Sequence, residues 1–60
     1  MNVVRILRRA EVEHLTGMSR STIYAAMQRG DFPKQVRIGR RSVGWMSDAV
    51  EGWLQSRSQL

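Results

Sequence analysis

Apolar residues recur at helical spacing in two short segments that only a few residues separate. The first segment, residues 9–16, is predicted to form a helix of about two turns that stops at Gly17. The second, residues 20–28, is predicted to begin after the N-cap residue Ser19 and to close at Gly30. Two helices joined by so short a connection meet at a sharp corner, which is the helix-turn-helix pattern.

Each of these predicted helices carries an apolar face. Arg9 and Glu13 are spaced to form an i,i+4 ion pair on the first helix. The residues placed on or near its apolar face are Ala10, Val12 and Leu15. Ile23 is predicted at the centre of the buried face of the second helix, with Ala26 and Met27 beside it. Its exposed side then comprises Ser21, Ala25 and Gln28, with Thr22, Tyr24 and Arg29 on the flanks.

A proline and an alternating pattern predict a β-hairpin after the second helix. Pro33 fixes its own backbone angle and keeps Phe32 out of the helical region, so the chain continues in an extended conformation. Residues 35–38 and 43–45 alternate between polar and apolar on either side of a turn at residues 39–42. The apolar residues predicted to share one face of this hairpin are Val36, Ile38, Val43 and Trp45.

The remaining segments add a short strand and a closing helix. Val4 and Ile6 alternate with Arg5, which indicates a short extended segment. Ser47 is predicted to cap a last helix with an apolar stripe of Val50, Trp53 and Leu54. The predicted fold class is mainly α with a small β-hairpin, in the order helix-turn-helix, hairpin wing and closing helix. This is a winged helix-turn-helix that forms a single domain over residues 1–60.

Length and composition exclude several classes of protein. Sixty residues make one small domain with little interior for a deep substrate pocket, so a multi-domain enzyme is excluded. The chain has no cysteine, which excludes a disulfide scaffold and a zinc finger. Its longest apolar run, residues 23–27, is far shorter than the roughly 20 residues that span a bilayer. No signal peptide precedes the charged residue Arg5, so we expect a cytoplasmic protein.

The charge of the chain favours a polyanionic partner. The net charge is +5, and nine of the ten basic residues are arginine, the side chain that binds phosphates and guanine edges in a bidentate manner. These arginines gather in the second helix and the hairpin, the two parts that a winged helix presents to DNA. The candidate DNA-binding residues are Ser19, Arg20, Ser21, Thr22, Tyr24, Gln28, Arg29, Arg37, Arg40 and Arg41. The alternative interpretation is an arginine-rich face that is simply solvated.

Chemistry other than binding has weak support in the sequence. His14 is the only histidine and is expected on the surface of the first helix, without a cysteine partner. Asp48 and Glu51 resemble a carboxylate pair, but their position at the start of the closing helix is explained by the helix dipole. Trp45 and Trp53 lie at core periodicity, so we expect them to pack in the core and not to stack on bases. We therefore expect no catalytic residue, no metal and no cofactor.

The order and spacing of several segments resemble one known family. They are residues 17–24, Phe32-Pro33, residues 36–39 with Arg41, residues 43–45, and Val50 with Trp53. Together they resemble the AlpA family of phage and prophage regulators over residues 6–54. The resemblance implies a MerR-like, excisionase-related winged helix and a role in transcription. The matching recognition-helix positions are Ser19, Arg20, Ser21, Thr22 and Tyr24, and the matching wing positions are Arg37, Gly39, Arg40 and Arg41.

Two positions depart from the pattern of that family. Ala10 occupies a position where a basic residue is common, which implies a weaker backbone contact from the first helix. Arg40 occupies a position often filled by proline or a small residue, which implies a stronger contact from the wing.

The sequence leaves several functions open. They are a sequence-specific transcriptional regulator on double-stranded DNA, an excisionase-like architectural factor that bends attachment-site DNA, and an adaptor that binds an acidic protein. A recombinase or RNA polymerase is a candidate partner, and a membrane is not. A single module recognises only one short DNA site, so we expect self-association on DNA by a protein that is a monomer or weak dimer when free.

Overall fold

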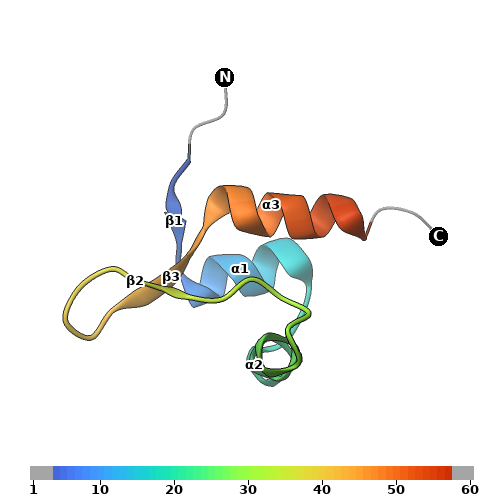
Figure 1. The fold of residues 1–60 in the computed structure, drawn as a ribbon, viewed down its shortest axis with the longest axis horizontal. Helices are drawn as coiled ribbons and strands as arrows, with labels where there is room; N and C mark the ends of the chain where they lie inside the picture. The colour runs from blue at the N-terminus through green and yellow to red at the C-terminus, as the bar shows by residue number, and fades with distance from the viewer. Residues whose placement is uncertain (1–3, 58–60) are drawn as a thin grey trace.

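The computed structural model describes residues 4–57. Three helices and three short strands follow one another along this part of the chain (Figure 1). In chain order they are β1 (Ile6–Leu7), α1 (Arg9–Thr16), α2 (Arg20–Arg29), β2 (Val36–Arg37), β3 (Val43–Met46) and α3 (Ser47–Ser56). The predicted class, mainly α with a small hairpin in the order of a winged helix-turn-helix, is confirmed.

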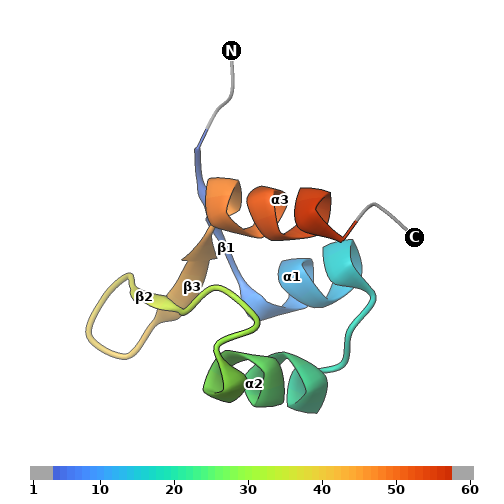
Figure 2. The ribbon, with the colours of Figure 1, turned by 45° about the vertical axis from the view of Figure 1, so that its right-hand side comes forward.

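The helices form layers around the sheet. In both ribbon views α1 lies in the middle, with α3 on one side of it and α2 on the other (Figures 1 and 2). The β2–β3 hairpin projects from the end of the molecule opposite the end at which α3 finishes (Figure 2). The outer side of α2 and the hairpin are therefore the parts that stand clear of the core. No helix within residues 4–57 has the length and apolar character needed to cross a membrane.

The corner between α1 and α2 forms as the sequence predicts. Gly17 takes a left-handed conformation, with φ of 73°, and its N–H donates to the carbonyl of Glu13 at 2.8 Å. Two residues later, the Ser19 hydroxyl accepts from the backbone N–H of Thr22 at 3.3 Å and caps α2. Gly30 closes α2, which is one residue longer than predicted. A β-carbon at Gly17 would strain this backbone, so glycine keeps the connection short.

The apolar face predicted for α1 is only partly correct. Val12 is completely buried, but Leu15 is 50% exposed and Ala10 is also exposed. Val12 is therefore the one residue of α1 that is buried. The face predicted for α2 is confirmed, because Ile23 and Ala26 are buried and Met27 packs against them.

The hairpin has a register different from the predicted one. Val36 lies opposite Gly44, and Arg37 lies opposite Val43. The backbone N–H of Ile38 donates to the carbonyl of Ser42 at 2.8 Å. The turn is therefore one residue shorter than the predicted turn at 39–42, because Ser42 already pairs with Ile38. A register shift of one residue moves every side chain of one strand to the opposite face of the sheet. The shared face predicted for Val36, Ile38, Val43 and Trp45 is wrong, because the first two lie on the face opposite the last two.

The extended segment at the start of the chain becomes the third strand of the sheet. The strand order is β1-β3-β2, with Ile6 opposite Met46 and Leu7 opposite Trp45. The central strand passes very close to its neighbours at Gly44. A β-carbon there would lie 2.7 Å from the carbonyl oxygen of Leu7 and 2.5 Å from a side-chain carbon of Ile6. Only glycine fits at this position.

An aromatic cluster forms much of the core. Trp45 is completely buried, and its indole N–H donates to the carbonyl of Pro33 at 2.9 Å. Phe32 makes edge contacts with Trp45 and with Trp53, at ring-centroid distances of 6.3 and 4.9 Å. The prediction that both tryptophans pack in the core is confirmed. Phe32 also lies in the core. Its sequence context predicted only that the chain is extended at this residue, because it precedes Pro33.

The start of α3 corrects another prediction. The N-cap residue is Met46, and Ser47 is the first residue of the helix, 7% exposed. The Ser47 hydroxyl accepts from the backbone N–H of Arg5 at 2.8 Å, and the Ser47 N–H donates to the Arg5 carbonyl at 2.8 Å. Ser47 therefore does not cap α3, because its hydroxyl joins the helix to the segment before β1. The predicted stripe of α3 is confirmed, with Val50 buried and Trp53 and Leu54 packed against the core.

Candidate nucleic-acid interface

Charge is divided unequally along the chain. The five carboxylates belong to α1, to α3 and to Asp31, so residues 14–30 and 32–47 contain none. These two ranges include the whole of α2 and the whole β2–β3 hairpin. We call this hairpin, with its loop at residues 38–42, the wing. Both parts keep an uncompensated positive charge, which is the electrostatic pattern of a surface that meets a polyanion.

Three hydroxyl groups cluster where α2 begins. The Ser19 hydroxyl lies 2.9 Å from the hydroxyl of Thr22 and 3.3 Å from that of Ser21. All three residues are exposed. Hydroxyls at the start of a helix can donate to phosphates or to base edges. The structure thus brings these three predicted site residues together on the first turn of α2.

Tyr24 is fixed in place on the next turn of α2. The guanidinium of Arg20 lies 5.5 Å from the centre of its ring, and Gln35 donates a hydrogen bond of 3.0 Å to its hydroxyl. Its ring also meets Trp45 edge to face, at 6.5 Å between centroids. Tyr24 is half-buried and lines three separate surface hollows, so it forms the ridge between them. The contact with Gln35 was not predicted, because these two residues come from separate elements.

The far end of α2 is less basic than the sequence suggests. The Nε of Arg29 lies 3.1 Å from the carboxylate of Asp31, and both side chains are well exposed. Gln28 is exposed and lines a hollow with Lys34. Two predicted site residues therefore lie at this end, but one of them is paired with a carboxylate of the same chain.

The wing loop is held mainly by its own backbone. The carbonyl of Ser42 accepts from the N–H groups of Ile38 and Gly39, at 2.8 and 3.3 Å. Arg37 donates from its guanidinium to the carbonyl of Arg40 at 3.0 Å, so its side chain supports the loop. Arg40 and Arg41 are exposed, and neither has an ion pair with any carboxylate of residues 4–57. The tip of the wing therefore presents two uncompensated guanidiniums.

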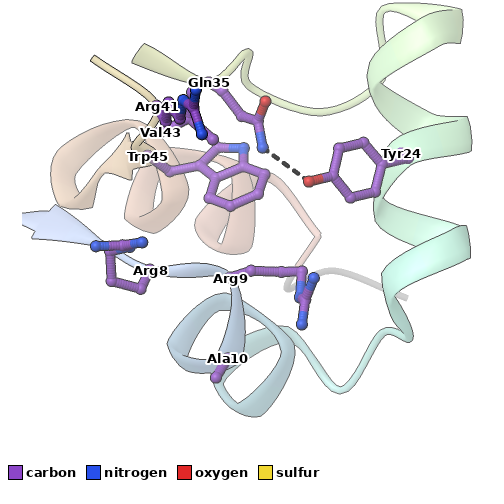
Figure 3. Close-up of a pocket in the computed structure, with 8 residues that line it drawn as sticks. All are labelled: Arg8, Arg9, Ala10, Tyr24, Gln35, Arg41, Val43 and Trp45. Carbon is purple, nitrogen blue, oxygen red and sulfur yellow. Dashed lines mark hydrogen bonds between the residues drawn. The ribbon is translucent and has the colours of Figure 1, made fainter. Parts of the chain in front are cut away.

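A cleft of about 340 Å³ lies between α1, α2 and the wing. One side of it is formed by the start of α1, and the other by Tyr24, Gln35 and Arg41, with Trp45 between the two sides (Figure 3). It is lined there by Arg8, the N-cap residue of α1, and by Arg9 and Ala10 of the first turn. Neither of these arginines was predicted as a site residue, although two adjacent arginines at the start of a helix are a visible sign. The ion pair predicted between Arg9 and Glu13 is confirmed, at 3.1 Å.

Glu11 neutralises Arg5 on another side of α1. The Arg5 guanidinium lies 2.9 Å from the Glu11 carboxylate, and the backbone N–H of Arg8 donates to the same carboxylate at 3.3 Å. These hydrogen bonds, the one from the Arg5 side chain above all, lower the pKa of Glu11 below its usual range. The carboxylate therefore stays charged at neutral pH and compensates the guanidinium of Arg5.

The described residues offer no arrangement for metal-based chemistry. Within residues 4–57 no group of three histidine, cysteine or acidic side chains lies close enough to hold a metal ion. His14 is exposed on α1, as predicted. The chemistry that the arrangement does support is recognition, since a polar helix face and a basic wing project side by side. These features define a winged helix-turn-helix domain.

Comparison with known proteins places the domain in one family. The sequence profile of the prophage CP4-57 regulatory protein (AlpA) family matches residues 5–58. The chain is 47% identical over 53 residues to the uncharacterized protein ORF88 of Enterobacteria phage P4, covering 88% of this chain and 60% of that protein. It is 38% identical over 65 residues to the DNA-binding transcriptional activator AlpA of Escherichia coli K12, covering 98% of this chain and 93% of that protein.

The chain belongs to the AlpA family of prophage regulatory proteins, because the family profile covers nearly all of it. The family resemblance seen in the sequence is thus confirmed. The chain spans 60% of the length of the phage P4 relative, and nearly all of the E. coli relative.

Proposed function

We propose that this protein is a sequence-specific regulator of transcription that binds double-stranded DNA. The first turns of α2 enter the major groove, and the wing contacts the adjacent backbone or minor groove. In this proposal Ser19, Arg20, Ser21, Thr22, Tyr24 and Gln28 act from the helix, and Arg29, Arg37, Arg40 and Arg41 contribute charge at its end and in the wing. The protein acts on DNA in the bacterial cytoplasm, as one domain without a catalytic role or a cofactor.

One observation carries this proposal. The exposed side of α2 and the wing both stand clear of the core (Figure 2). The residue ranges that contain them, 14–30 and 32–47, include no carboxylate. A face that met a neutral or mixed-charge protein surface would not need to exclude acidic residues over two such stretches. The similarity to a DNA-binding transcriptional activator of E. coli supports the same proposal.

The electrostatic part of the proposal is tested by salt dependence. If about five arginines neutralise phosphates, the slope of log K against log salt is about −4 to −5. A mobility-shift or fluorescence titration with a duplex of arbitrary sequence, at several salt concentrations, measures this slope. A wild-type protein that binds no duplex even at low salt would overturn the proposal and leave the adaptor for an acidic protein.

Sequence specificity and mode of action need a second experiment. Repeated selection from a random duplex pool yields the preferred site, and a gel assay with that site placed at different positions along a fragment measures bending. A preferred site without strong bending supports a regulator that recruits RNA polymerase. Strong bending of attachment-site DNA supports the excisionase-like alternative, with a recombinase as partner.

We also propose that the protein assembles on DNA in more than one copy. One module of this size contacts few base pairs, and helix-turn-helix proteins extend their sites by occupying half-sites about 10 base pairs apart. Sedimentation of the free protein should give a monomer or weak dimer, and footprinting on the selected site should show spaced protection. Tight dimerisation without DNA would contradict this expectation.

A further inference from the structure

The cleft between α1, α2 and the wing stands out among the hollows of the molecule. Its volume of about 340 Å³ is at the small end of ligand pockets, which occupy about 300–1,000 Å³. Pockets for small organic ligands are mostly apolar. This one is lined by three guanidiniums together with the side chains of Tyr24 and Gln35 (Figure 3). Its chemistry therefore suits an oxyanion and not an apolar ligand.

The arginines of the cleft keep donors that no protein group uses. Arg8 and Arg41 make no ion pair with any carboxylate of residues 4–57, and the ion pair of Arg9 with Glu13 involves its Nε. Glu11, the nearest carboxylate in sequence to Arg8, is held by the guanidinium of Arg5. The cleft is thus a concentration of positive charge that the fold itself does not neutralise. Such an arrangement carries a charge-repulsion cost unless an anion occupies it.

The position of the cleft selects the anion. It is bounded on one side by Tyr24 of α2 and on another by Arg41 of the wing, the two parts that the proposed function assigns to DNA. A DNA strand that passes from the groove occupied by α2 to the wing must cross this junction. The group that a strand presents there is a phosphodiester, which arginine binds with two parallel hydrogen bonds.

We infer that one backbone phosphodiester of the bound DNA sits in this cleft, held jointly by Arg8 at the start of α1 and Arg41 of the wing. The inference rests on the proposed function and extends it, because it adds Arg8 to the DNA-binding residues and makes one phosphate common to the start of α1 and the wing. The joint grip also fixes the wing relative to the helix pair once DNA is bound. Arg9 lies beside the same phosphate and adds charge.

Salt dependence distinguishes one shared phosphate from two separate ones. Each phosphate neutralised contributes about −0.9 to the slope of log K against log salt. In the double variant Arg8→Gln with Arg41→Gln, loss of one shared phosphate flattens the slope by about 0.9. Loss of two separate phosphates flattens it by about 1.8. The probe is a duplex of arbitrary sequence, so the measurement does not depend on knowing the preferred site.

A charge-matched control separates a local contact from the loss of overall charge. The variant Arg57→Glu lowers the net charge by the same two units at the end of α3, where the guanidinium of Arg57 contacts the Trp53 ring and the Asp31 carbonyl. We expect it to leave the slope of the wild type unchanged. Thermal melting of both variants checks that they fold. If the Arg8→Gln/Arg41→Gln variant melts early, it is replaced by Arg8→Lys with Arg41→Lys, which keeps the charge and should have the salt-dependence slope of the wild type.

A further arm identifies the source of the phosphate. Inorganic phosphate, added at an ionic strength matched with sodium chloride, should displace the duplex no better than the chloride does. Stronger displacement that vanishes in the Arg8/Arg41 variant would assign the cleft to a free anion and overturn the inference.

The outcomes separate this inference from the proposed function. If the wild type binds no duplex, the proposed function fails and the inference fails with it. If the wild type binds but the cleft variant keeps the wild-type slope, or flattens it by about 1.8, only the joint grip is overturned.

Discussion

The helix α2 and the loop of the wing both expose arginines, but the two are held in different ways. Ile23 and Ala26 seat α2 in the core, and on its outer side Tyr24 is fixed by Arg20, Gln35 and Trp45. The loop at residues 38–42 rests on two backbone hydrogen bonds and one from a side chain.

This difference suits two kinds of contact. Recognition of a base edge needs donors held within a fraction of an ångström, which a helix on a packed core provides. A phosphate accepts hydrogen bonds from many directions and tolerates a looser support. The structure therefore favours base recognition by α2 and backbone contact by the wing.

The largest expected effect comes from shortening the buried side chain that packs α2 against the core. Ile23→Ala should lower the free energy of unfolding by about 2–5 kcal/mol, because it leaves a cavity under the helix. Val43→Ala is the control in the wing, where the side chain is 37% exposed, and should lose less than about 1 kcal/mol. Urea denaturation of both variants measures the difference. Similar losses would show that the wing is seated as firmly as α2.

The base and the tip of the wing should differ as well. Gly44→Ala should destabilise the protein by about 1–3 kcal/mol, because the new carbon would meet the Leu7 carbonyl oxygen and force the strands apart. Gly39→Ala meets no atom within 4 Å and should change stability by no more than about 0.5 kcal/mol. Thermal melting compares them. An unaffected Gly44→Ala variant would mean that β1 and β3 separate easily.

Binding should separate α2 from the wing by specificity. Arg20→Ala should weaken binding by about 1–3 kcal/mol at one base position and relax the preference there. The double change of Arg40 and Arg41 to alanine should weaken binding to all duplexes alike. Competition with single-base variants of the selected duplex measures both effects. A position-specific loss in the wing variant would reverse the assignment of roles.

The smallest expected effect concerns the far end of α2. Asp31→Asn removes the carboxylate that pairs with Arg29 and should tighten DNA binding by less than about 1 kcal/mol, since the pair is exposed. The matched control is Glu51→Gln on α3, which removes the same charge on a helix that lies on the other side of α1 from α2. Titrations at low salt are needed to resolve so small a change. Equal tightening in both variants would attribute it to net charge alone.

Local signals in the sequence are sufficient for the corner between α1 and α2, but not for the sheet or for the start of α3. Gly17, Ser19 and the spacing around Ile23 predict the helix corner, because capping and periodicity act within a few residues. The predicted register of the hairpin was wrong because a turn one residue shorter fits the same alternation of polar and apolar residues. The prediction of Ser47 as a cap was wrong because its hydroxyl bonds to Arg5, a residue 42 positions away that no local pattern connects with it.

The candidate site shows the same limit. The residues that share α2 were found together, since a helix places them by spacing alone. The sequence places Asp31 two residues after Arg29, so an ion pair between them could be predicted. Whether Arg29 pairs with this carboxylate or contacts DNA depends on the geometry of the folded chain. The cleft was missed because its walls come from α1, α2 and the wing, which only the folded chain brings together.

The bond between Arg5 and Ser47 also governs when this domain becomes complete. The segment that leads into β1 and the residue that opens α3 are 42 positions apart, and each donates a hydrogen bond to the other. A ribosome adding about 5–20 residues per second needs roughly two to eight seconds to cover that interval. Until then Leu7 lacks Trp45, its partner across the sheet. Folding of this domain therefore waits for the closing helix, and the nascent chain carries an unfinished core until Trp45 and Ser47 have been added.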